Sequence, residues 1–169
     1  MLIGVISDTH DNLTALRRAL EKFQTRGVKL VLHAGDFVSP FVAVPFQEAG
    51  LSLVGVFGNN DGDKLYLRER FSGVGELNFG PHELELSGRR ILLMHEPRAL
   101  EALIASGKYD FIVYGHTHEV DLRPGLPLVL NPGECGGWLS GRATCAIVDL
   151  ETLEAEIIEL PPKTQGEER

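Results

Sequence analysis

Residues 2–10 read Leu2-Ile3-Gly4-Val5-Ile6-Ser7-Asp8-Thr9-His10, a short apolar run that leads directly into a carboxylate and an imidazole. An apolar run of this length, bounded by turn-forming residues, predicts a buried strand. From residue 13 onward leucines recur at helical spacing, with Asn12 in the N-cap position and Gly27 as a stop, which predicts a helix. A strand followed by a returning helix is the repeating unit of a parallel α/β sheet.

The same unit follows twice more. Residues 30–33 form a second apolar run that leads to Gly35-Asp36, and a helix is predicted after Ser39-Pro40. Residues 51–57 form a third run, which leads to Gly58-Asn59-Asn60-Asp61. Three strands joined by helices predict parallel pairing with right-handed crossovers.

The second half of the chain has the pattern of hairpins. Strand pairs are predicted at residues 82–86 with 91–95, 120–123 with 128–131, and 143–149 with 155–160. A short helix at 98–106 and a buried strand at 111–114 are predicted between the first two pairs. This order indicates an α/β fold with a mixed sheet, or with two packed sheets flanked by helices. We expect one domain at 1–160 and a polar, disordered tail at 161–169.

Composition limits the classes of function. The chain has 169 residues, of which 43% are hydrophobic, values typical of one globular domain. The net charge of −8 disfavours non-specific binding of nucleic acid, although bound divalent cations can reverse the potential locally. No apolar run approaches the roughly 20 residues of a membrane span, and no signal-peptide pattern is present. We therefore expect a cytoplasmic protein without a membrane partner.

Five successive predicted strand ends carry side chains that bind metals. The carboxyl ends of parallel strands meet at one edge of a sheet, where ligands bind. Each fragment alone is weak, since Asp-x-His after a strand is more often a turn with a helix cap. Turns, however, do not require this complete set of donors at successive strand ends. The predicted ligands are Asp8, His10, Asp36, Asn59, His95, His116 and His118.

The donor types restrict the metal. Imidazole and carboxylate without thiolate favour Mn²⁺, Fe²⁺, Zn²⁺, Ni²⁺ or Co²⁺ over Mg²⁺ and Ca²⁺. Seven donors exceed one tetrahedral zinc site, whereas two ions that share one carboxylate would use all of them. Of the other histidines, His33 is interpreted as structural and His82 as exposed. Cys135 and Cys145 are interpreted as buried thiols, with a regulatory disulfide or a metal ligand as alternatives.

These motifs together resemble those of the calcineurin-like metallophosphoesterase superfamily, in its small bacterial and archaeal phosphodiesterase branch. The family pattern is D-x-H, G-D, G-N-x-[DE], H and G-H-x-H. It is matched by Asp8-Thr9-His10, Gly35-Asp36, Gly58-Asn59-Asn60-Asp61, His95 and Gly115-His116-Thr117-His118, and Asn131-Pro132-Gly133 resembles a further family segment.

The resemblance implies a four-layer α/β/β/α sandwich of two mixed sheets flanked by helices. It implies a phosphodiesterase with two divalent ions, Mn²⁺ foremost, acting on a small phosphodiester. One ion would take Asp8, His10, Asp36 and His118, and the other Asp36, Asn59, His95 and His116, so that Asp36 bridges them. A hydroxide that bridges the ions would then attack phosphorus in line.

Two positions depart from the family pattern. Many relatives have a histidine that protonates the leaving group where this chain has Asn60, and a carboxamide cannot deliver a proton near neutral pH. Departure would then rely on the ions, water, Asp61 or an intrinsically good leaving group, so Asp36, Asn59, Asn60 and Asp61 are the predicted catalytic residues. Glu96 replaces a common glycine after His95, either to orient that ring or as a solvated carboxylate.

Other functions stay open at this point. A non-catalytic scaffold of the same fold has no need of a complete ligand set, and a phosphomonoesterase is disfavoured by the missing acid. A nuclease is disfavoured by the acidic charge and the lack of a basic aromatic groove. Exposed hairpin edges could pair in a homo-oligomer. The candidates for the pocket rim are Phe37, Asp63, Tyr66 and Trp138, although for each of them a packing role is favoured over contact with a ligand.

Overall fold

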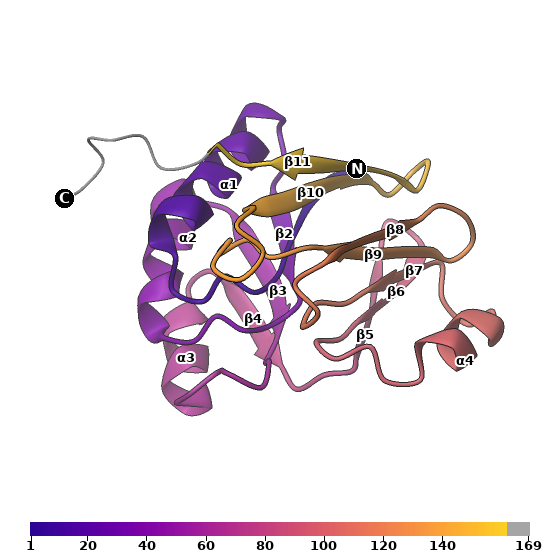
Figure 1. The fold of residues 1–169 in the computed structure, drawn as a ribbon, viewed down its shortest axis with the longest axis horizontal. Helices are drawn as coiled ribbons and strands as arrows, with labels where there is room; N and C mark the ends of the chain where they lie inside the picture. Colours follow the sequence, from indigo (N-terminus) through magenta and orange to yellow (C-terminus); the bar gives the residue numbers. More distant parts are fainter. Residues whose placement is uncertain (162–169) are drawn as a thin grey trace.

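Two mixed β-sheets pack face to face, with helices outside each of them (Figure 1). The computed structural model describes residues 1–161, so the tail predicted at 161–169 lies, beyond its first residue, outside the described part. The strand order is β11-β10-β1-β2-β3-β4 in one sheet and β5-β6-β7-β9-β8 in the other. The predicted α/β sandwich of two mixed sheets and flanking helices is confirmed.

The six-stranded sheet contains the N-terminal strands that the sequence predicts. Strands β1 to β4 run parallel to one another. Strand β10 pairs antiparallel with β1, and β11 pairs antiparallel with β10. The strands are β1 (Leu2–Ile6), β2 (Leu30–His33), β3 (Ser52–Val56), β4 (Gly75–Asn78), β10 (Thr144–Asp149) and β11 (Glu154–Glu159).

The five-stranded sheet is parallel at its centre and antiparallel at its edges. Strands β6, β7 and β9 are parallel, and β5 and β8 flank them in the opposite direction. The three predicted hairpins are therefore confirmed as β5–β6, β8–β9 and β10–β11. The strands of this sheet are β5 (His82–Leu86), β6 (Arg89–Leu93), β7 (Phe111–Val113), β8 (Val120–Arg123) and β9 (Leu128–Pro132).

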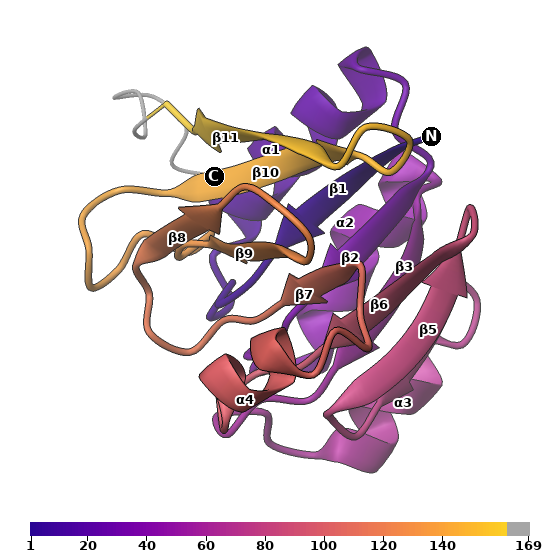
Figure 2. The same ribbon diagram turned by 90° about the vertical axis from the view of Figure 1, so that its right-hand side faces the viewer.

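Helices cover the outer faces of both sheets unequally. Helix α1 (Leu13–Thr25), the short helices η1 (Pro40–Val42) and α2 (Ala43–Ala49), and α3 (Lys64–Phe71) form one layer beside the six-stranded sheet (Figure 1). Among the helices of residues 1–161, only α4 (Leu100–Ala105) lies outside the five-stranded sheet, as the view from that side shows (Figure 2). None of the helices within residues 1–161 is long and apolar enough to cross a bilayer.

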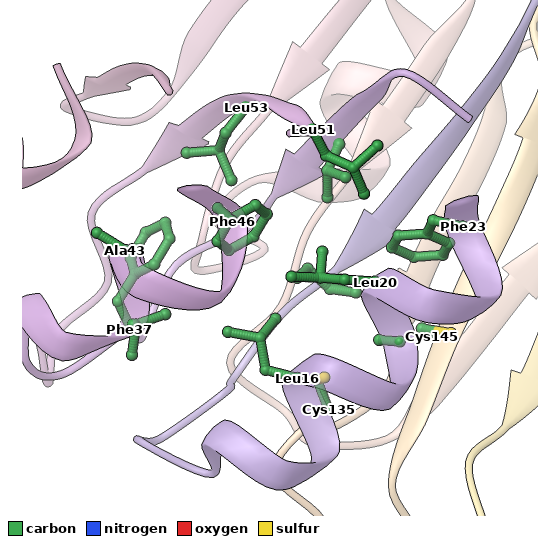
Figure 3. Packing of buried hydrophobic residues seen from close by; sticks show 14 of the residues in the cluster. Leu16, Leu20, Phe23, Phe37, Ala43, Phe46, Leu51, Leu53, Cys135 and Cys145 are labelled. Carbon is green, nitrogen blue, oxygen red and sulfur yellow. The ribbon is translucent and has the colours of Figure 1, made fainter. Parts of the chain in front are cut away.

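The part of the chain that the structure describes has three apolar clusters, and alternation along β1 sends side chains into two of them. Ile3 and Val5 of β1 face the second sheet, while Ile6 faces the helices. On the helix side, Leu16, Leu20 and Phe23 of α1 pack with residues of α2 and β3 (Figure 3). Each of these buried side chains contributes about 1.5–3 kcal/mol to folding. The sandwich therefore fixes the ends of β1, β2 and β3 from both faces.

Two elements differ from the predictions, while one side chain has a role that the predictions favoured. Helix α3 and strand β4 were not predicted, because α3 buries only Leu67 and Phe71 and β4 buries only Leu77. Phe37, a candidate for the pocket rim, has the packing role that was favoured for it: its ring is fully buried and stacks on His33, with ring centroids 3.6 Å apart. Phe37 follows the predicted ligand Asp36 in the sequence, but burial of its apolar ring directs it into the core.

Candidate metal centre

The seven predicted metal ligands lie together at one edge of the sandwich. Within the cluster, every side chain lies within hydrogen-bond or ion-pair distance of at least one other. The cluster is built from the loops after β1, β2 and β3 of one sheet and after β6 and β7 of the other. The predicted convergence of five strand ends is thus what the structure contains, while the role of these side chains in binding metal stays a prediction.

Asp36 occupies the centre of the cluster. Its Oδ2 lies 3.5 Å from Nε2 of His10 and 3.5 Å from Nε2 of His95. On the first side, Oδ1 of Asp8 lies 3.7 Å from Nε2 of His10 and 3.6 Å from Nε2 of His118. One carboxylate oxygen is therefore placed equally between two halves of the site.

The second half consists of an amide oxygen and two imidazoles. Oδ1 of Asn59 lies 2.8 Å from Nε2 of His95 and 2.9 Å from Nδ1 of His116, and these two nitrogens are 3.3 Å apart. His95 Nδ1 donates to the carbonyl oxygen of Ala34 at 2.8 Å, which leaves Nε2 facing the cluster. A neutral His95 therefore presents a lone pair toward the other donors, as a metal ligand must.

Unpaired buried atoms show that the residues fit a cation. Among the described residues 1–161, Oδ1 of Asp8 and Nε2 of His10 are buried and have no hydrogen-bond partner. A buried polar atom left unpaired costs about 1–3 kcal/mol, more if it is charged. Donor atoms of Asp8, His10 and His118 lie within 4.8 Å of one another, as do those of Asp8, Asp36 and His95. A divalent ion would satisfy both unpaired atoms at once.

The carboxylates of the cluster favour the protonated form of two of its histidines, His10 and His95. The nearby carboxylate of Asp8, 3.7 Å from Nε2, is the main cause that raises the pKa of His10. Burial works to lower the pKa of His95, but the Asp36 carboxylate outweighs it and raises the pKa above its usual value. The cluster therefore attracts positive charge, whether as protons or as metal.

The backbone around the cluster is strained. Five of the seven predicted ligands have φ between 41° and 70°, in the left-handed region, and these are Asp8, His10, Asp36, His116 and His118. Such conformations cost about 1–3 kcal/mol each and persist only where the surroundings enforce them. Glycines permit the close approach, since a Cβ on Gly58 would overlap the Asp36 carboxylate and one on Gly115 would overlap Ser7.

Asn60 and Asp61 both support Asp36. The backbone and side-chain nitrogens of Asn60 donate to the two carboxylate oxygens of Asp36 at 2.8 and 2.7 Å. Burial works to raise the pKa of Asp36, but the imidazole of His95 and the hydrogen bonds from Asn60 hold it well below its usual value. The buried carboxylate of Asp61 accepts from the amides of Gly58 and Val38 at 2.7 and 2.8 Å, and burial raises its pKa.

Glu134 was missed by the sequence analysis. Its buried carboxylate accepts hydrogen bonds from the backbone amides of Trp138, Leu139 and Ser140 at 2.6–2.9 Å, and its Oε1 lies 3.4 Å from Nδ1 of His118. Burial works to raise the pKa of Glu134, but these hydrogen bonds outweigh it and lower the pKa. The only signal in the sequence was its place directly after Asn131-Pro132-Gly133.

His33 connects two of the ligand loops from below. Its Nδ1 accepts from the amide of Gly35 at 3.1 Å, and its Nε2 lies 3.2 Å from Oγ1 of Thr9, which donates to the carbonyl oxygen of Asp36 at 3.2 Å. This chain of bonds requires a neutral ring with its proton on Nε2. Burial accordingly holds the pKa of His33 well below its usual value.

Several other predicted residues lie near the site in other roles. Trp138 donates from its indole to the carbonyl oxygen of His10 at 3.0 Å, whereas Asp63 caps α3. Glu96 pairs with Arg98 at 2.7 Å, which lowers its pKa, and does not orient His95. The side chain of His82 is 25% exposed, less than predicted.

Other predicted side chains lie farther out or inside the core. Tyr66 is exposed on α3, and both cysteines are buried and free, so the interpretation of Cys135 and Cys145 as buried thiols agrees with the structure.

Comparison with known proteins assigns the family. Residues 1–153 match the model of the calcineurin-like phosphoesterase superfamily domain. The chain is 40% identical to phosphodiesterase MJ0936 of Methanocaldococcus jannaschii over 91% of this chain and 96% of that one. It is 32% identical to a probable metallophosphoesterase of Methanothermobacter thermautotrophicus, over 94% and 92% of the two chains. A solved archaeal phosphodiesterase superposes with a TM-score of 0.88 at 38% identity, covering 95% of this chain and all of that one.

The chain therefore belongs to the calcineurin-like phosphoesterase superfamily. Within that family, the protein is a phosphoric ester hydrolase.

The neutral state of His33 predicts a pH dependence of stability. Because the pKa of His33 is lowered in the folded state, the unfolded chain takes up the proton first as the pH falls below the usual value of 6.5. The contribution of His33 is thus fully present above that pH and is lost below it. We expect this difference in urea unfolding measured from about pH 5 to 8. As the pH falls below 6.5, the free energy of unfolding of the wild-type protein should decrease by up to about 1.4 kcal/mol per pH unit more than that of His33→Gln. Equal slopes would contradict the prediction.

The contacts of Glu134 predict an effect on metal affinity as well as on stability. In Glu134→Gln an amide nitrogen would face backbone N–H donors, and the charge beside His118 would be lost. We expect Mn²⁺ to bind about 10–100-fold more weakly by calorimetry, as is typical when a partner of a ligand is removed. Glu151→Gln, in an exposed turn, is the matched control. Lower thermal stability with unchanged Mn²⁺ affinity would show that Glu134 only supports its loop.

Proposed function

We propose that the protein is a metal-dependent phosphodiesterase with a two-ion site. The observation that carries the proposal is the position of Asp36 Oδ2, which is 3.5 Å from imidazole nitrogens on both of its sides. The phosphodiesterase name of the relative with 40% identity supports the choice of substrate class.

The donor set divides naturally about Asp36. Asp8, His10 and His118 would hold one ion with Asp36, and Asn59, His95 and His116 would hold the other. Mn²⁺ is the first candidate, and Ni²⁺, Co²⁺, Fe²⁺ and Zn²⁺ suit the same mixed donors. Bound there, two divalent ions supply an activated water for attack on phosphorus and neutralise charge on the phosphoryl oxygens.

The protein's own contribution is to hold these donors in place. Asn60 fixes both oxygens of Asp36, and Asp61 ties the loops after β2 and β3 together through backbone amides. Because the Asp61 carboxylate is occupied by these amides, we assign it a positioning role rather than proton transfer. Asn60 cannot protonate a leaving group, so substrates whose leaving group needs no proton should react best.

The alternatives have less support. A non-catalytic scaffold would not require strained backbone at five donor residues. A phosphomonoesterase remains the second candidate, disfavoured by the absence of a general acid at Asn60. Cytoplasmic location and homo-oligomerisation stay predictions.

Metal-dependent turnover is the decisive test. With bis(p-nitrophenyl) phosphate as substrate, we expect activity in Mn²⁺ that chelator abolishes. Asp36→Asn and His95→Ala should lower kcat/KM by about 100-fold or more, since loss of a ligand's outer partner alone costs 10–100-fold. Asp149→Asn and His82→Ala, which alter the same residue types outside the cluster, are the controls. Full activity of Asp36→Asn would overturn the two-ion proposal.

The missing acid also predicts a substrate preference. An aryl phosphodiester releases a stable phenolate, whereas an alkyl phosphomonoester releases an alkoxide that needs a proton. We expect kcat/KM to be higher for bis(p-nitrophenyl) phosphate than for glycerol phosphate, and introduction of a histidine by Asn60→His to narrow the difference. Equal rates on both substrates in the wild-type protein would contradict this explanation.

A further inference from the structure

A cavity opens directly beside the second half of the metal cluster. Its volume is about 330 Å³, and Asn59 and His95 of the cluster form part of its wall. The wall also includes Phe57, Phe79 and Lys64. A volume at the lower end of the usual range for ligand pockets suits a small organic group rather than a polymer.

Two aromatic rings form part of the cavity wall. The rings of Phe57 and Phe79 have centroids 5.1 Å apart and planes inclined by 53°. Phe57 is 7% exposed and anchors the pair in the core, whereas Phe79 is 66% exposed. The guanidinium carbon of Arg68 lies 5.6 Å from both centroids, and Nε of Arg68 donates to the carbonyl oxygen of Leu77 at 3.0 Å. The two rings are therefore held in position although one of them faces the solvent.

The cavity wall also carries more positive than negative side chains. Nζ of Lys64 donates to the carbonyl oxygen of Asp61 at 2.7 Å, and Arg98 pairs with Glu96 at 2.7 Å. The wall thus carries two cationic side chains, Lys64 and Arg98, and one carboxylate, Glu96, in a protein whose net charge is −8. This local reversal of charge suits a ligand that carries a phosphoryl group.

We propose that this cavity binds a planar aromatic group, an aryl ring or a nucleobase, of a phosphate ester whose phosphoryl group lies at the metal cluster. The proposal rests on the proposed function for the position of the phosphoryl group. Offset or tilted stacking on Phe79 and Phe57 supplies the selectivity, because aromatic pairs gain more than the burial of their area alone. Phe79 is then a residue that determines specificity, and α3 and the β4–β5 connection form the substrate-binding wall.

Binding of phosphomonoesters to the Mn²⁺-loaded protein tests the proposal without requiring turnover. Phenyl phosphate and cyclohexyl phosphate have rings of similar size, but only phenyl can stack. By calorimetry, phenyl phosphate should bind about 2–10-fold more tightly than cyclohexyl phosphate. Cytidine 5′-monophosphate tests the nucleobase source in the same way, with ribose 5-phosphate as its comparison.

Variants of two exposed phenylalanines separate stacking from general effects. Phe79→Leu should reduce the preference for phenyl phosphate over cyclohexyl phosphate to about 1. Phe41→Leu, at a phenylalanine that is 71% exposed on η1, should keep the full preference. Equal affinities for the two ring compounds in wild-type protein, or an unchanged preference in Phe79→Leu, would overturn the proposal.

The outcome also distinguishes this proposal from the proposed function. If the protein hydrolyses diesters but binds phenyl and cyclohexyl phosphate equally, the proposal of an aromatic pocket is rejected and the proposed phosphodiesterase function is kept. If the protein prefers phenyl phosphate but hydrolyses no diester, the proposal of an aromatic pocket is kept and the proposed phosphodiesterase function is rejected. Where the preference for phenyl phosphate is present, tighter binding of cytidine 5′-monophosphate than of ribose 5-phosphate would extend the ligands of the cavity to nucleotides, and equal binding of these two would restrict the ligands to aryl esters.

Discussion

Two fully buried carboxylates, Asp8 and Asp36, impose the main constraint on this molecule. A buried anion is very unfavourable unless it is paired and hydrogen-bonded. Here Asp36 receives two hydrogen bonds from Asn60, and Asp8 receives them from the Ser7 hydroxyl and the amide of His116. Oδ1 of Asp8 is left without a hydrogen bond in the described part of the chain. A bound cation would neutralise the negative charge that remains on these carboxylates, and the surrounding imidazoles would bind the same cation.

Buried polar contacts hold the backbone of the cluster in its strained conformation. The left-handed backbone of five cluster residues would relax in an isolated loop, so the surrounding structure must enforce it. Buried polar groups do this from several sides. Asp61 holds the loops after β2 and β3, Asn131 holds the loop that carries His116 by donating to the carbonyl oxygen of Gly115 at 3.1 Å, and Glu134 holds the loop of Trp138. The three apolar clusters of the described chain supply the stability that these polar arrangements do not.

Much of the fold and the site could be predicted from the sequence because both depend on local patterns. The apolar runs of β1, β2 and β3 are nearly continuous since both sheet faces are covered, and a predicted metal ligand follows each of them in the next loop. What could not be predicted depends on tertiary contacts. Glu134 acquires its role only because a distant loop folds over its carboxylate.

The least predictable segment is also the one that would select the substrate. Helix α3 and strand β4 carry few buried side chains, so their apolar pattern is weak, yet with the following loop they supply Lys64 and Phe79 to the cavity wall. This division has a physical cause. A metal cluster needs donors of fixed chemistry on rigid strand ends, and these leave a readable pattern in the sequence. A substrate wall needs exposed side chains on a covering layer, where burial imposes little, so that many sequences would fold equally well and specificity can change without loss of the fold.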